Sequence, residues 1–423
     1  MASFIPETNL KRIVIIGGGF GGIELAHRLD TTKFQVVLLD KNNFHTFQPL
    51  LYQVATGGLE PDSVAYPIRK IFANKKNFVF RVVEALKIRS EENILVTNNG
   101  ELKYDYLVLA TGSTTNFFGN TAIEKNAMRL KGVTDALDLR SLLLQNFEEV
   151  LTMPNDPQRE KFFNIVIVGG GPTGVEIAGA LAELKKHVLP NDYPELNFMD
   201  LKIHLVEASG KLLSGMSEKS SVKAKEFLEK MGVLIWNSSV VSYADEKAIL
   251  KDGTVILSST LIWTAGVKGK IIDGLDENTL TRSSRFKVDA YNKIISYDNI
   301  FAIGDLAAVS HNGKESHPMV APVAIQQAKN LASNLNKNDS RSWKGFIYKD
   351  LGSMATIGRN KAVAELGHLK FQGILAWFIW MFVHLMSIVG FRNRIIVLIN
   401  WMWNYFSYDR AIRLIIRPFK KSE

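Results

Sequence analysis

The hydrophobic and polar positions of the chain repeat one pattern twice. An apolar run at residues 12–16 (RIVII) leads through glycines into a stretch at 23–29 (IELAHRL), and residues 164–168 (NIVIV) lead in the same way into 175–184 (VEIAGALAEL). Short β-branched runs bounded by glycine are typical of buried strands, and the stretches that follow them have the period of a helix. The pattern predicts an α/β protein with two tandem β-α-β units.

A second pattern follows each unit. Residues 93–112 read as a strand, an Asn-Gly turn and another strand ending at Gly112, and residues 247–266 repeat this around an Asp-Gly turn and end at Gly266. Such dipeptides between apolar runs are strong hairpin signals. The first glycines of the two units are 152 residues apart and the two closing glycines 154 apart. We therefore expect two similar domains, each with a small antiparallel flap.

The turn after each first strand has the G-x-G-x-x-G spacing. The glycines are Gly17, Gly19 and Gly22 in the first unit, and Gly169, Gly171 and Gly174 in the second. In this fingerprint the first glycine makes the tight turn, the second lets a pyrophosphate approach the backbone, and the third packs helix on strand. The phosphates then accept hydrogen bonds from the free amides of the helix N-terminus.

Each unit also has a carboxylate where its second strand ends. "FQVVLLD" ends at Asp40 and "LKIHLVE" at Glu207. A carboxylate at this place accepts hydrogen bonds from an adenosine ribose and repels a 2′-phosphate, so Glu207 favours NADH over NADPH. Two copies of the motif, each with its strand and its carboxylate, predict two Rossmann-like dinucleotide sites.

Charge and cysteine content limit which binding partners and which kinds of chemistry the chain can have. The net charge is +9, and from Lys370 onward eight Lys or Arg residues face only Asp409 and Glu423, so most of the excess lies in the tail. Because Trp and Ile alternate with these charges, an anionic membrane surface suits the tail better than nucleic acid. The chain has no cysteine, which excludes disulfides, thiolate metal sites and thiol catalysis. The start has no cleavable signal pattern, and we expect the bulk of the protein in the cytosol.

The tail contains 21 residues, Phe371–Phe391, without Asp, Glu, Lys or Arg. A helix of that length is about 31 Å long and could cross the hydrocarbon of a bilayer. The basic residues that follow it would then lie on the wrong side of the membrane, and the next apolar run is too short to return. We therefore expect a surface anchor over residues 371–417.

Two amphipathic segments are expected within that anchor. The first would place its polar face at Asn400, Asn404 and Ser407; the second would place Arg410, Arg413 and Arg417 opposite Ile412, Ile415 and Ile416. We expect four tryptophans at the headgroup level: Trp377, Trp380, Trp401 and Trp403. An alternative remains open, in which these helices cover a soluble core or the interface of a homodimer.

Together with "NIFAIGDLA" at residues 299–307, the two units resemble the two-dinucleotide-binding-domain flavoprotein family. The resemblance implies FAD in the first domain, residues 1–117 and 285–335, and NADH in the second, residues 118–284, followed by a C-terminal domain from 336 to 423. The implied FAD residues are Gly17, Gly19, Gly22, Asp40, Thr111, Gly112 and Asp305. The implied NADH residues are Gly169, Gly171, Gly174, Glu207, Ala265 and Gly266.

Three further stretches, at residues 44–69, 319–332 and 354–366, look like type II NADH dehydrogenase, and the tail is similar to the bacterial branch of that family. The resemblance implies that Glu176 and Gln326 lie at the quinone pocket, where Glu176 would relay a proton. Many members carry another glutamine four residues before Gln326. This chain has Pro322 there, which puts that contact in doubt.

The sequence thus predicts a respiratory flavoenzyme that oxidises NADH and reduces a membrane quinone without pumping protons. It would sit on the cytoplasmic face of the cell membrane as a peripheral protein. Ubiquinone and menaquinone both remain open as acceptors. The alternatives are a reductase of a soluble carrier such as rubredoxin or ferredoxin, and an NADH-responsive flavoprotein that acts mainly by binding a partner.

Overall fold

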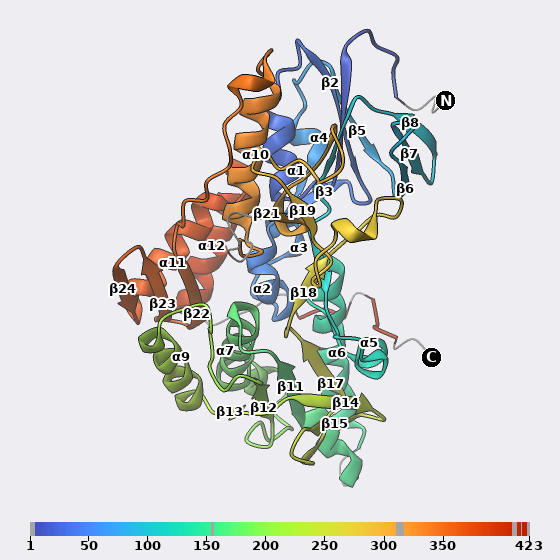
Figure 1. Ribbon diagram of the computed structural model, residues 1–423. Coiled ribbons are helices and arrows are strands. Elements are labelled where there is room, and N and C mark those ends of the chain that lie inside the picture. The colour runs from blue at the N-terminus through green and yellow to red at the C-terminus, as the bar shows by residue number, and fades with distance from the viewer. Residues whose placement is uncertain (1–4, 154–155, 310–316, 408–412, 416, 421–423) are drawn as a thin grey trace. The chain divides into compact units, whose positions relative to one another are not determined.

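The computed structural model describes residues 5–153, 156–309, 317–407, 413–415 and 417–420. The chain forms two compact units (Figure 1). The first comprises residues 1–45, 66–114 and 267–350, and the second comprises residues 46–65, 115–266 and 351–423. The domain boundaries expected at residues 118, 285 and 336 stay a prediction.

The first unit is built on a parallel five-stranded sheet with the strand order β20-β9-β1-β2-β5. Its strands are β1 (Lys11–Ile16), β2 (Phe34–Asp40), β5 (Phe78–Val82), β9 (Tyr106–Leu109) and β20 (Ile300–Ala302). The apolar runs of β1 and β2 are almost wholly buried, as expected for a parallel sheet covered on both faces. Helices α1 (Phe20–Arg28) and α10 (Ala321–Leu335) pack against each other.

The predicted flap of this unit is the antiparallel sheet β6-β7-β8. Its strands are β6 (Ala85–Arg89), β7 (Ile94–Thr97) and β8 (Gly100–Lys103). Shorter elements complete the unit: α4 (Ile68–Ile71), β18 (Val267–Gly269), β19 (Phe286–Val288), the 3-10 turn η4 (Gly304–Leu306) and β21 (Ala307–Val309).

The second unit repeats this plan. Its parallel sheet has the order β13-β12-β11-β17, and its flap is the antiparallel sheet β14-β15-β16. The strands are β11 (Asn164–Val168), β12 (Lys202–Val206), β13 (Val233–Trp236), β14 (Val240–Ala244), β15 (Lys247–Leu250), β16 (Val255–Leu257) and β17 (Thr260–Trp263). The main helices are α6 (Val133–Leu151), α7 (Pro172–His187) and α9 (Glu218–Lys230). The duplication predicted from the sequence is confirmed.

The C-terminal elements belong to the second unit. An antiparallel sheet of β22 (Ser353–Gly358), β23 (Lys361–Leu366) and β24 (Leu369–Gln372) is followed by α11 (Ile374–Ser387) and α12 (Phe391–Ser407), red-orange in Figure 1. Two short helices, α2 (Leu51–Ala55) and α3 (Pro61–Val64), lie in the same unit, and α3 contacts α12.

Helix α7 lies directly against β22. A Cβ atom on Gly179 would come within 1.7 Å of the carbonyl oxygen of Ile357, so no side chain separates the two backbones there. Only glycine permits so close an approach.

The uncharged stretch Phe371–Phe391 is not one helix, contrary to one possibility weighed from its hydropathy. Its first two residues belong to β24, and Gly373 (φ 70°) and Gly390 (φ 88°) mark the starts of α11 and α12. The helix within the stretch has 14 residues. None of the helices in the described parts of the chain has the length and apolar character needed to cross a bilayer.

The expected helical anchor up to residue 417 is also wrong in its last part. α12 ends at Ser407, and residues 413–415 and 417–420 are not helical. Arg413 pairs with Asp192 at 2.7 Å and Arg417 with Asp138 at 2.5 Å, so these cations are bound to the protein itself. Arg410, Ile412 and Ile416 of the predicted segment lie outside the described residues.

Candidate functional site

The first glycine turn joins β1 to α1. Gly17 has φ 111°, and a Cβ atom there would lie 2.3 Å from the carbonyl oxygen of Ala110. A Cβ on Gly22 would lie 1.8 Å from the carbonyl oxygen of Gly17, so the helix can approach the strand only because Gly22 has no side chain. Around Gly19 no described atom lies within 4 Å of the Cβ position. The start of α1 is therefore open to a ligand.

Asp40 lies beside this turn, as predicted. Its Oδ2 accepts the N–H of Gly18 at 2.6 Å and its Oδ1 accepts the N–H of Asn42 at 2.7 Å. Helix α1 has no side-chain cap, so its first amides are left for a ligand. Free amides for phosphate and a fixed carboxylate for ribose are the groups that the ADP part of FAD requires, and the turn fits that cofactor.

The other predicted FAD residues lie near the carboxyl ends of β9 and β20. The Thr111 hydroxyl donates to the carbonyl oxygen of Lys270 at 2.5 Å, and the Ser113 hydroxyl donates to Oδ2 of Asp305 at 2.5 Å. Gly112 has φ 69° and open space at its Cβ position. The fold thus brings Asp305 and the turn after β9 together.

Sequence reasoning missed two buried groups beside Asp305. Gln327 is fully buried and its Oε1 accepts the N–H of Gly304 at 2.6 Å. Arg285 is also buried, and its Nη2 donates to the carbonyl oxygen of Ala307 at 2.5 Å. Its charge attracts Asp305, while burial lowers the pKa of the Arg285 guanidinium. Both residues hold the turn that presents Asp305.

Gln326, assigned by resemblance to the quinone pocket, lies in the first unit. Its Nε2 donates to the carbonyl oxygen of Lys349 at 2.9 Å, and its Oε1 accepts the N–H of Lys349 at 3.0 Å. In this structure the amide fastens the segment around Lys349 to α10. A contact between Gln326 and quinone remains a prediction.

The second glycine turn joins β11 to α7 with the same geometry. Gly169 has φ 108°, and a Cβ there would lie 2.6 Å from Cα of Ala265. A Cβ on Gly174 would lie 1.9 Å from the carbonyl oxygen of Gly169, whereas the Cβ position of Gly171 has no described neighbour within 4 Å. The start of α7 is uncapped by any side chain. It is a second open anion site of the dinucleotide type.

Glu207 follows β12 and lies against this turn. Its Oε2 accepts the N–H of Gly170 at 2.6 Å, and its Oε1 accepts the N–H and the hydroxyl of Ser209 at 2.8 and 2.7 Å. Burial alone would raise the pKa of Glu207, but these hydrogen bonds outweigh it and hold the pKa below its ordinary value. The carboxylate is charged at neutral pH, as recognition of a ribose diol requires.

Ala265 and Gly266 follow β17 after Thr264. The backbone of Ala265 lies against Gly169, and a Cβ on Gly266 would meet the ring of Phe118 at 2.8 Å. The nearby indole of Trp263 donates to the carbonyl oxygen of Asn116 at 2.9 Å. These residues shape the second site by backbone and packing.

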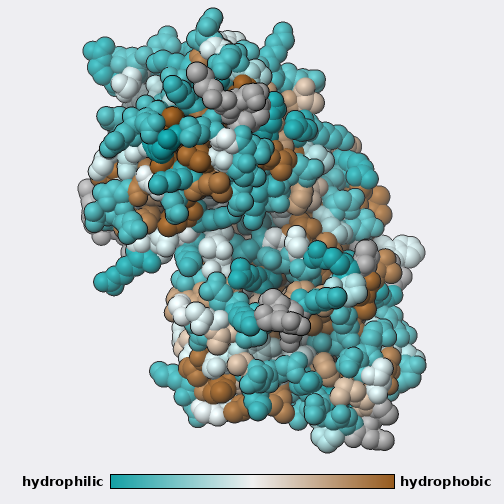
Figure 2. Space-filling view, turned by 90° about the vertical axis from the view of Figure 1, so that its right-hand side faces the viewer, coloured by the Kyte–Doolittle hydropathy of each residue, from teal (hydrophilic) through white to brown (hydrophobic). Residues whose placement is uncertain are grey.

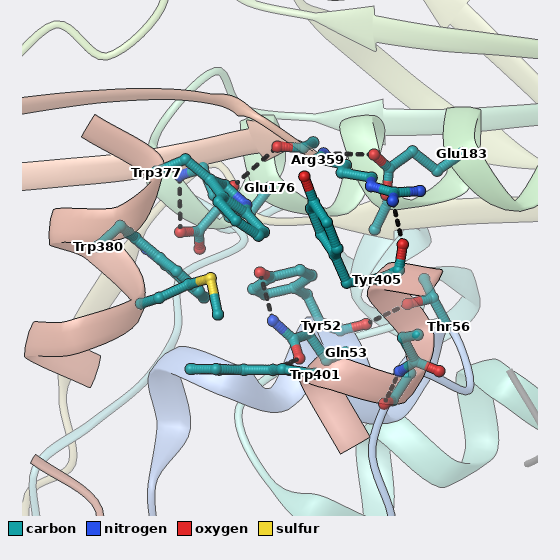
Figure 3. Close-up of a pocket in the computed structure, with 16 residues that line it drawn as sticks. Tyr52, Gln53, Thr56, Glu176, Glu183, Arg359, Trp377, Trp380, Trp401 and Tyr405 are labelled. Carbon is teal, nitrogen blue, oxygen red and sulfur yellow. Dashed lines mark hydrogen bonds between the residues drawn. The ribbon is translucent and has the colours of Figure 1, made fainter. Parts of the chain in front are cut away.

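A separate pocket lies wholly within the second unit (Figure 3). Helices α2, α7, α11 and α12 and the turn after β22 supply its walls. Its lining includes five aromatic side chains: Tyr52, Trp377, Trp380, Trp401 and Tyr405. Glu176, Glu183 and Arg359 provide the charged or ionisable groups, and Arg359 stacks on Tyr405 with its guanidinium carbon 3.9 Å from the ring centre.

Glu176 projects from the second turn of α7 into this pocket. That the pocket is the quinone site, as the resemblance implies, stays a prediction. Glu176 is only 7% exposed, and its Oε1 accepts the N–H of Thr356 at 3.4 Å. Burial raises the pKa of Glu176 to about 8, because the N–H groups of Thr356 and Trp380 offset only part of the desolvation of the carboxylate. The carboxyl is therefore mostly protonated at neutral pH and can give up a proton.

Two of the tryptophans assigned to the membrane headgroups are in fact inside. Trp380 is 2% exposed and Trp401 is 9% exposed, and both line the pocket. The Trp401 indole donates to Oε1 of Gln53 at 2.8 Å. Trp377 is partly buried, while Trp403 is 62% exposed and keeps the predicted position on the surface.

The face of α12 that carries polar side chains docks on the protein. Asn404 donates to the carbonyl oxygen of Gly58 at 3.0 Å. Asn393, which is buried, donates to the carbonyl oxygens of Asp62, Ser63 and Ala65 at 2.9 to 3.2 Å. The predicted polar face is therefore not wholly a solvent face, because Asn404 donates to a backbone carbonyl within the unit, whereas Ser407 is exposed.

The opposite faces of α11 and α12 are apolar and exposed. On α11 the exposed residues are Ile374, Leu375, Phe378, Phe382, Val383 and Met386; on α12 they are Phe391, Ile395, Leu398, Ile399, Met402, Trp403 and Phe406. We call this set the apolar face. Figure 2 shows, by contrast, a view of the molecule in which hydrophilic residues predominate. Exposed large apolar side chains gathered on two neighbouring helices are typical of an interaction surface.

Two family models match the chain. Residues 11–328 match the pyridine nucleotide-disulphide oxidoreductase model, and residues 351–407 match the NDH2 C-terminal domain. Two curated relatives of Mycobacterium tuberculosis are similar over 95% of this chain. Type II NADH:quinone oxidoreductase Ndh is 34% identical, with 89% of its length covered, and type II NADH:quinone oxidoreductase NdhA is 36% identical, with 88% covered.

Solved structures have the same fold. NDH2 from Plasmodium falciparum in complex with NADH superposes with a TM-score of 0.88 over 96% of this chain and 100% of that one, at 22% identity. The sulfide:quinone oxidoreductase of Aquifex aeolicus superposes with a TM-score of 0.70 over 94% and 95% of the two chains, at 18% identity.

Proposed function

The chain belongs to the type II NADH:quinone oxidoreductase family, and from that premise we propose how its residues carry out the reaction. The protein is an FAD-dependent enzyme that oxidises NADH and reduces a quinone. We propose that the open start of α1, with Asp40 and Asp305, holds FAD. The open start of α7, with Glu207, holds NADH.

The observation that carries the proposal is Glu176 in its pocket. A buried carboxyl that keeps its proton near neutral pH lies among aromatic side chains, in a cavity formed partly by the helices that bear the apolar face. Planar quinone rings pack favourably against aromatic side chains. We place the quinone head in this pocket, where Glu176 donates one of the two protons that reduction to quinol requires.

The chain's own residues supply placement and proton control. FAD, when bound, would supply the redox chemistry, which is to take hydride from NADH and to pass two electrons to quinone. Glu207 and the turn at Gly171 fix the nucleotide, and the aromatic walls of the pocket exclude water from the quinone head. After quinol leaves, Glu176 regains its proton from solvent, so the sum is NADH, quinone and a proton giving NAD⁺ and quinol.

We further propose that the apolar face lies on the cytoplasmic surface of a membrane. A lipid-soluble acceptor and a water-soluble donor meet at one enzyme only if the enzyme sits at the bilayer surface. The exposed residues of α11 and α12 suit insertion to the depth of an interfacial helix. A reductase of a soluble carrier has no use for this face. A second copy of the chain in a homodimer would also cover it. Experiment can separate a membrane from a second copy as the occupant.

Anaerobic half-reactions test the proposal. The flavin is reduced with NADH, and a short-chain quinone is then added. Reoxidation on the scale of seconds is expected. A flavin that stays reduced with every quinone would contradict the quinone site and favour a binding role.

Vesicle flotation tests the apolar face. Phe406→Glu is expected to release the protein from vesicles, and Met199→Glu, at an exposed apolar residue outside α11 and α12, serves as control. Substitution is preferable to truncation because α11 and α12 also line the pocket. A wild-type dimer in detergent-free solution that Phe406→Glu converts to monomer would identify a homodimer as the occupant.

A further inference from the structure

The indole of Trp380 has a buried hydrogen-bond donor without an acceptor at ordinary hydrogen-bond geometry. Its Nε1 is inaccessible to solvent and has no acceptor among the described residues. A buried N–H without an acceptor is unfavourable, and such groups are rare in folded proteins. The ring lines the same pocket as Glu176.

The orientation of this indole is fixed by its neighbours. The ring of His384 stacks on it at a centroid distance of 4.2 Å and an angle of 24°, and Trp401 lies at 5.6 Å and 40°. His384 is itself held, because its Nδ1 donates to the carbonyl oxygen of Trp380 at 2.8 Å. Burial lowers the pKa of His384 to about 4, so this imidazole is neutral at physiological pH. The indole cannot turn away without breaking these contacts.

The N–H also interacts with the Glu176 carboxyl. It is close enough to lower the pKa of Glu176, yet the two side chains form no hydrogen bond of ordinary geometry. Figure 3 shows both groups at one side of the cavity. Two donors, one an N–H and one a protonated carboxyl, thus line the same cavity.

We propose that Trp380 is a further catalytic residue, whose indole N–H donates a hydrogen bond to the quinone carbonyl oxygen that Glu176 protonates. The inference rests on the proposed placement of quinone in this pocket. Trp380 keeps its hydrogen throughout. When two electrons arrive, the carbonyl π bond opens and negative charge develops on oxygen, which the N–H stabilises; Glu176 then transfers its proton to that oxygen. The second proton of the quinol comes from solvent, and the proton carried by the hydride of NADH returns to solvent, so the net uptake is one proton.

The donor has its greatest effect on the charged oxygen. A hydrogen bond to a charged acceptor is roughly twice as strong as one to a neutral acceptor, so the N–H favours reduced over oxidised quinone. Removal of one donor of this kind elsewhere lowers rates by about 100- to 1000-fold when it acts alone. Since Glu176 remains, we expect a smaller loss, of about 10- to 100-fold.

The test uses Trp380→Phe in the flavin-loaded enzyme, which retains an aromatic ring and removes the N–H. With menadione and ubiquinone-1 as acceptors, kcat/KM is expected to fall about 10- to 100-fold, mainly through kcat. The rate of flavin reduction by NADH and the rate with ferricyanide, which offers no carbonyl oxygen, are expected to stay within about twofold. Trp380→Tyr, which restores a hydroxyl donor, is expected to recover part of the loss.

The control is Trp343→Phe, which removes another buried indole N–H that has no acceptor among the described residues, at a residue outside the pocket. Because the N–H of Trp380 favours the carboxylate, Trp380→Phe is also expected to move the alkaline limb of the quinone pH profile upward, whereas the control leaves it in place. A quinone kcat/KM within twofold of wild type in Trp380→Phe, or an equal loss in Trp343→Phe, would overturn the inference. If wild-type enzyme itself fails to pass electrons to quinone, the proposed function fails instead.

Discussion

Replacing Glu176 by Gln should make the protein more stable at alkaline pH and slower with quinone. The Glu176 carboxyl is only 7% exposed and accepts one long hydrogen bond from the N–H of Thr356. The folded protein therefore favours the protonated, neutral carboxyl much more strongly than the unfolded chain does. Glutamine has nearly the same shape and is never charged. The substitution therefore removes the unfavourable ionisation and also removes the proton.

The size of the effect follows from linkage. The folded pKa of Glu176 is raised from 4.5 to about 8. Below about pH 4.5 the carboxyl is neutral in both states; as pH rises towards 8 the unfolded chain gains the charge and the folded protein resists it. Between pH 5 and pH 8 the wild type should lose about 3.5 kcal/mol relative to Glu176→Gln. For a chain of this length that corresponds to about 4 °C in Tm if it unfolds cooperatively.

Calorimetry of both proteins from pH 5 to pH 9 measures this directly. The difference in Tm should be small at pH 5, grow to pH 8 and then level off. Parallel Tm curves for wild type and Glu176→Gln would refute the buried neutral carboxyl. In the same samples, quinone reduction should fall about 100-fold in Glu176→Gln, and only the wild type should lose rate above pH 8.

Four further variants have expected outcomes. Gly171→Ala should fold with unchanged Tm but bind NADH at least tenfold more weakly by calorimetric titration, because its Cβ meets no described protein atom and would occupy the place of the pyrophosphate. Gly174→Ala should lower Tm by several degrees, because its Cβ would lie 1.9 Å from a carbonyl oxygen; equal stability of the two variants would contradict the geometry. Glu207→Gln should raise the KM for NADH and narrow its preference over NADPH in steady-state assays, and an unchanged preference would remove Glu207 from ribose recognition. Phe406→Glu should weaken vesicle binding at least tenfold while NADH reduces the flavin normally, since it replaces a 79% exposed apolar ring by a charge.

The geometry of the two glycine turns was predictable because it is local. Within a few residues, spacing alone decides that Gly17 turns the chain and Gly22 packs against it, and the end of the next strand brings Asp40 to the turn. The same signals repeat 152 residues later. Such features depend on backbone sterics, which the sequence expresses directly.

The pocket was not predictable in the same way. Hydropathy shows that α12 has an apolar and a polar side, but not which side faces the protein. The answer depends on carbonyl oxygens such as that of Gly58, more than 300 residues earlier in the chain, which bind Asn404. Once those bonds form, Trp401 faces the pocket and Phe406 faces outward.

The neighbouring glutamines of α10 give a different lesson. The resemblance to the family implied a role for Gln326, whereas the structure shows that its neighbour Gln327 is the buried glutamine. The helical period contains this information, because Val323, Gln327 and Leu331 lie four residues apart on one face, and all three are buried. A polar side chain in the middle of an apolar stripe was a readable sign of a structural hydrogen bond.

The bare approach of α7 to β22 at Gly179 has a mechanical consequence. With no side chains between the two backbones there is little to compress or repack, so the strand that offers the Thr356 amide and the helix that bears Glu176 move as one piece. When Glu176 loses its proton, α7 cannot then move away from β22 to let water solvate the new charge. The charge must be met by groups already in place, which keeps the reorganisation energy of each turnover small.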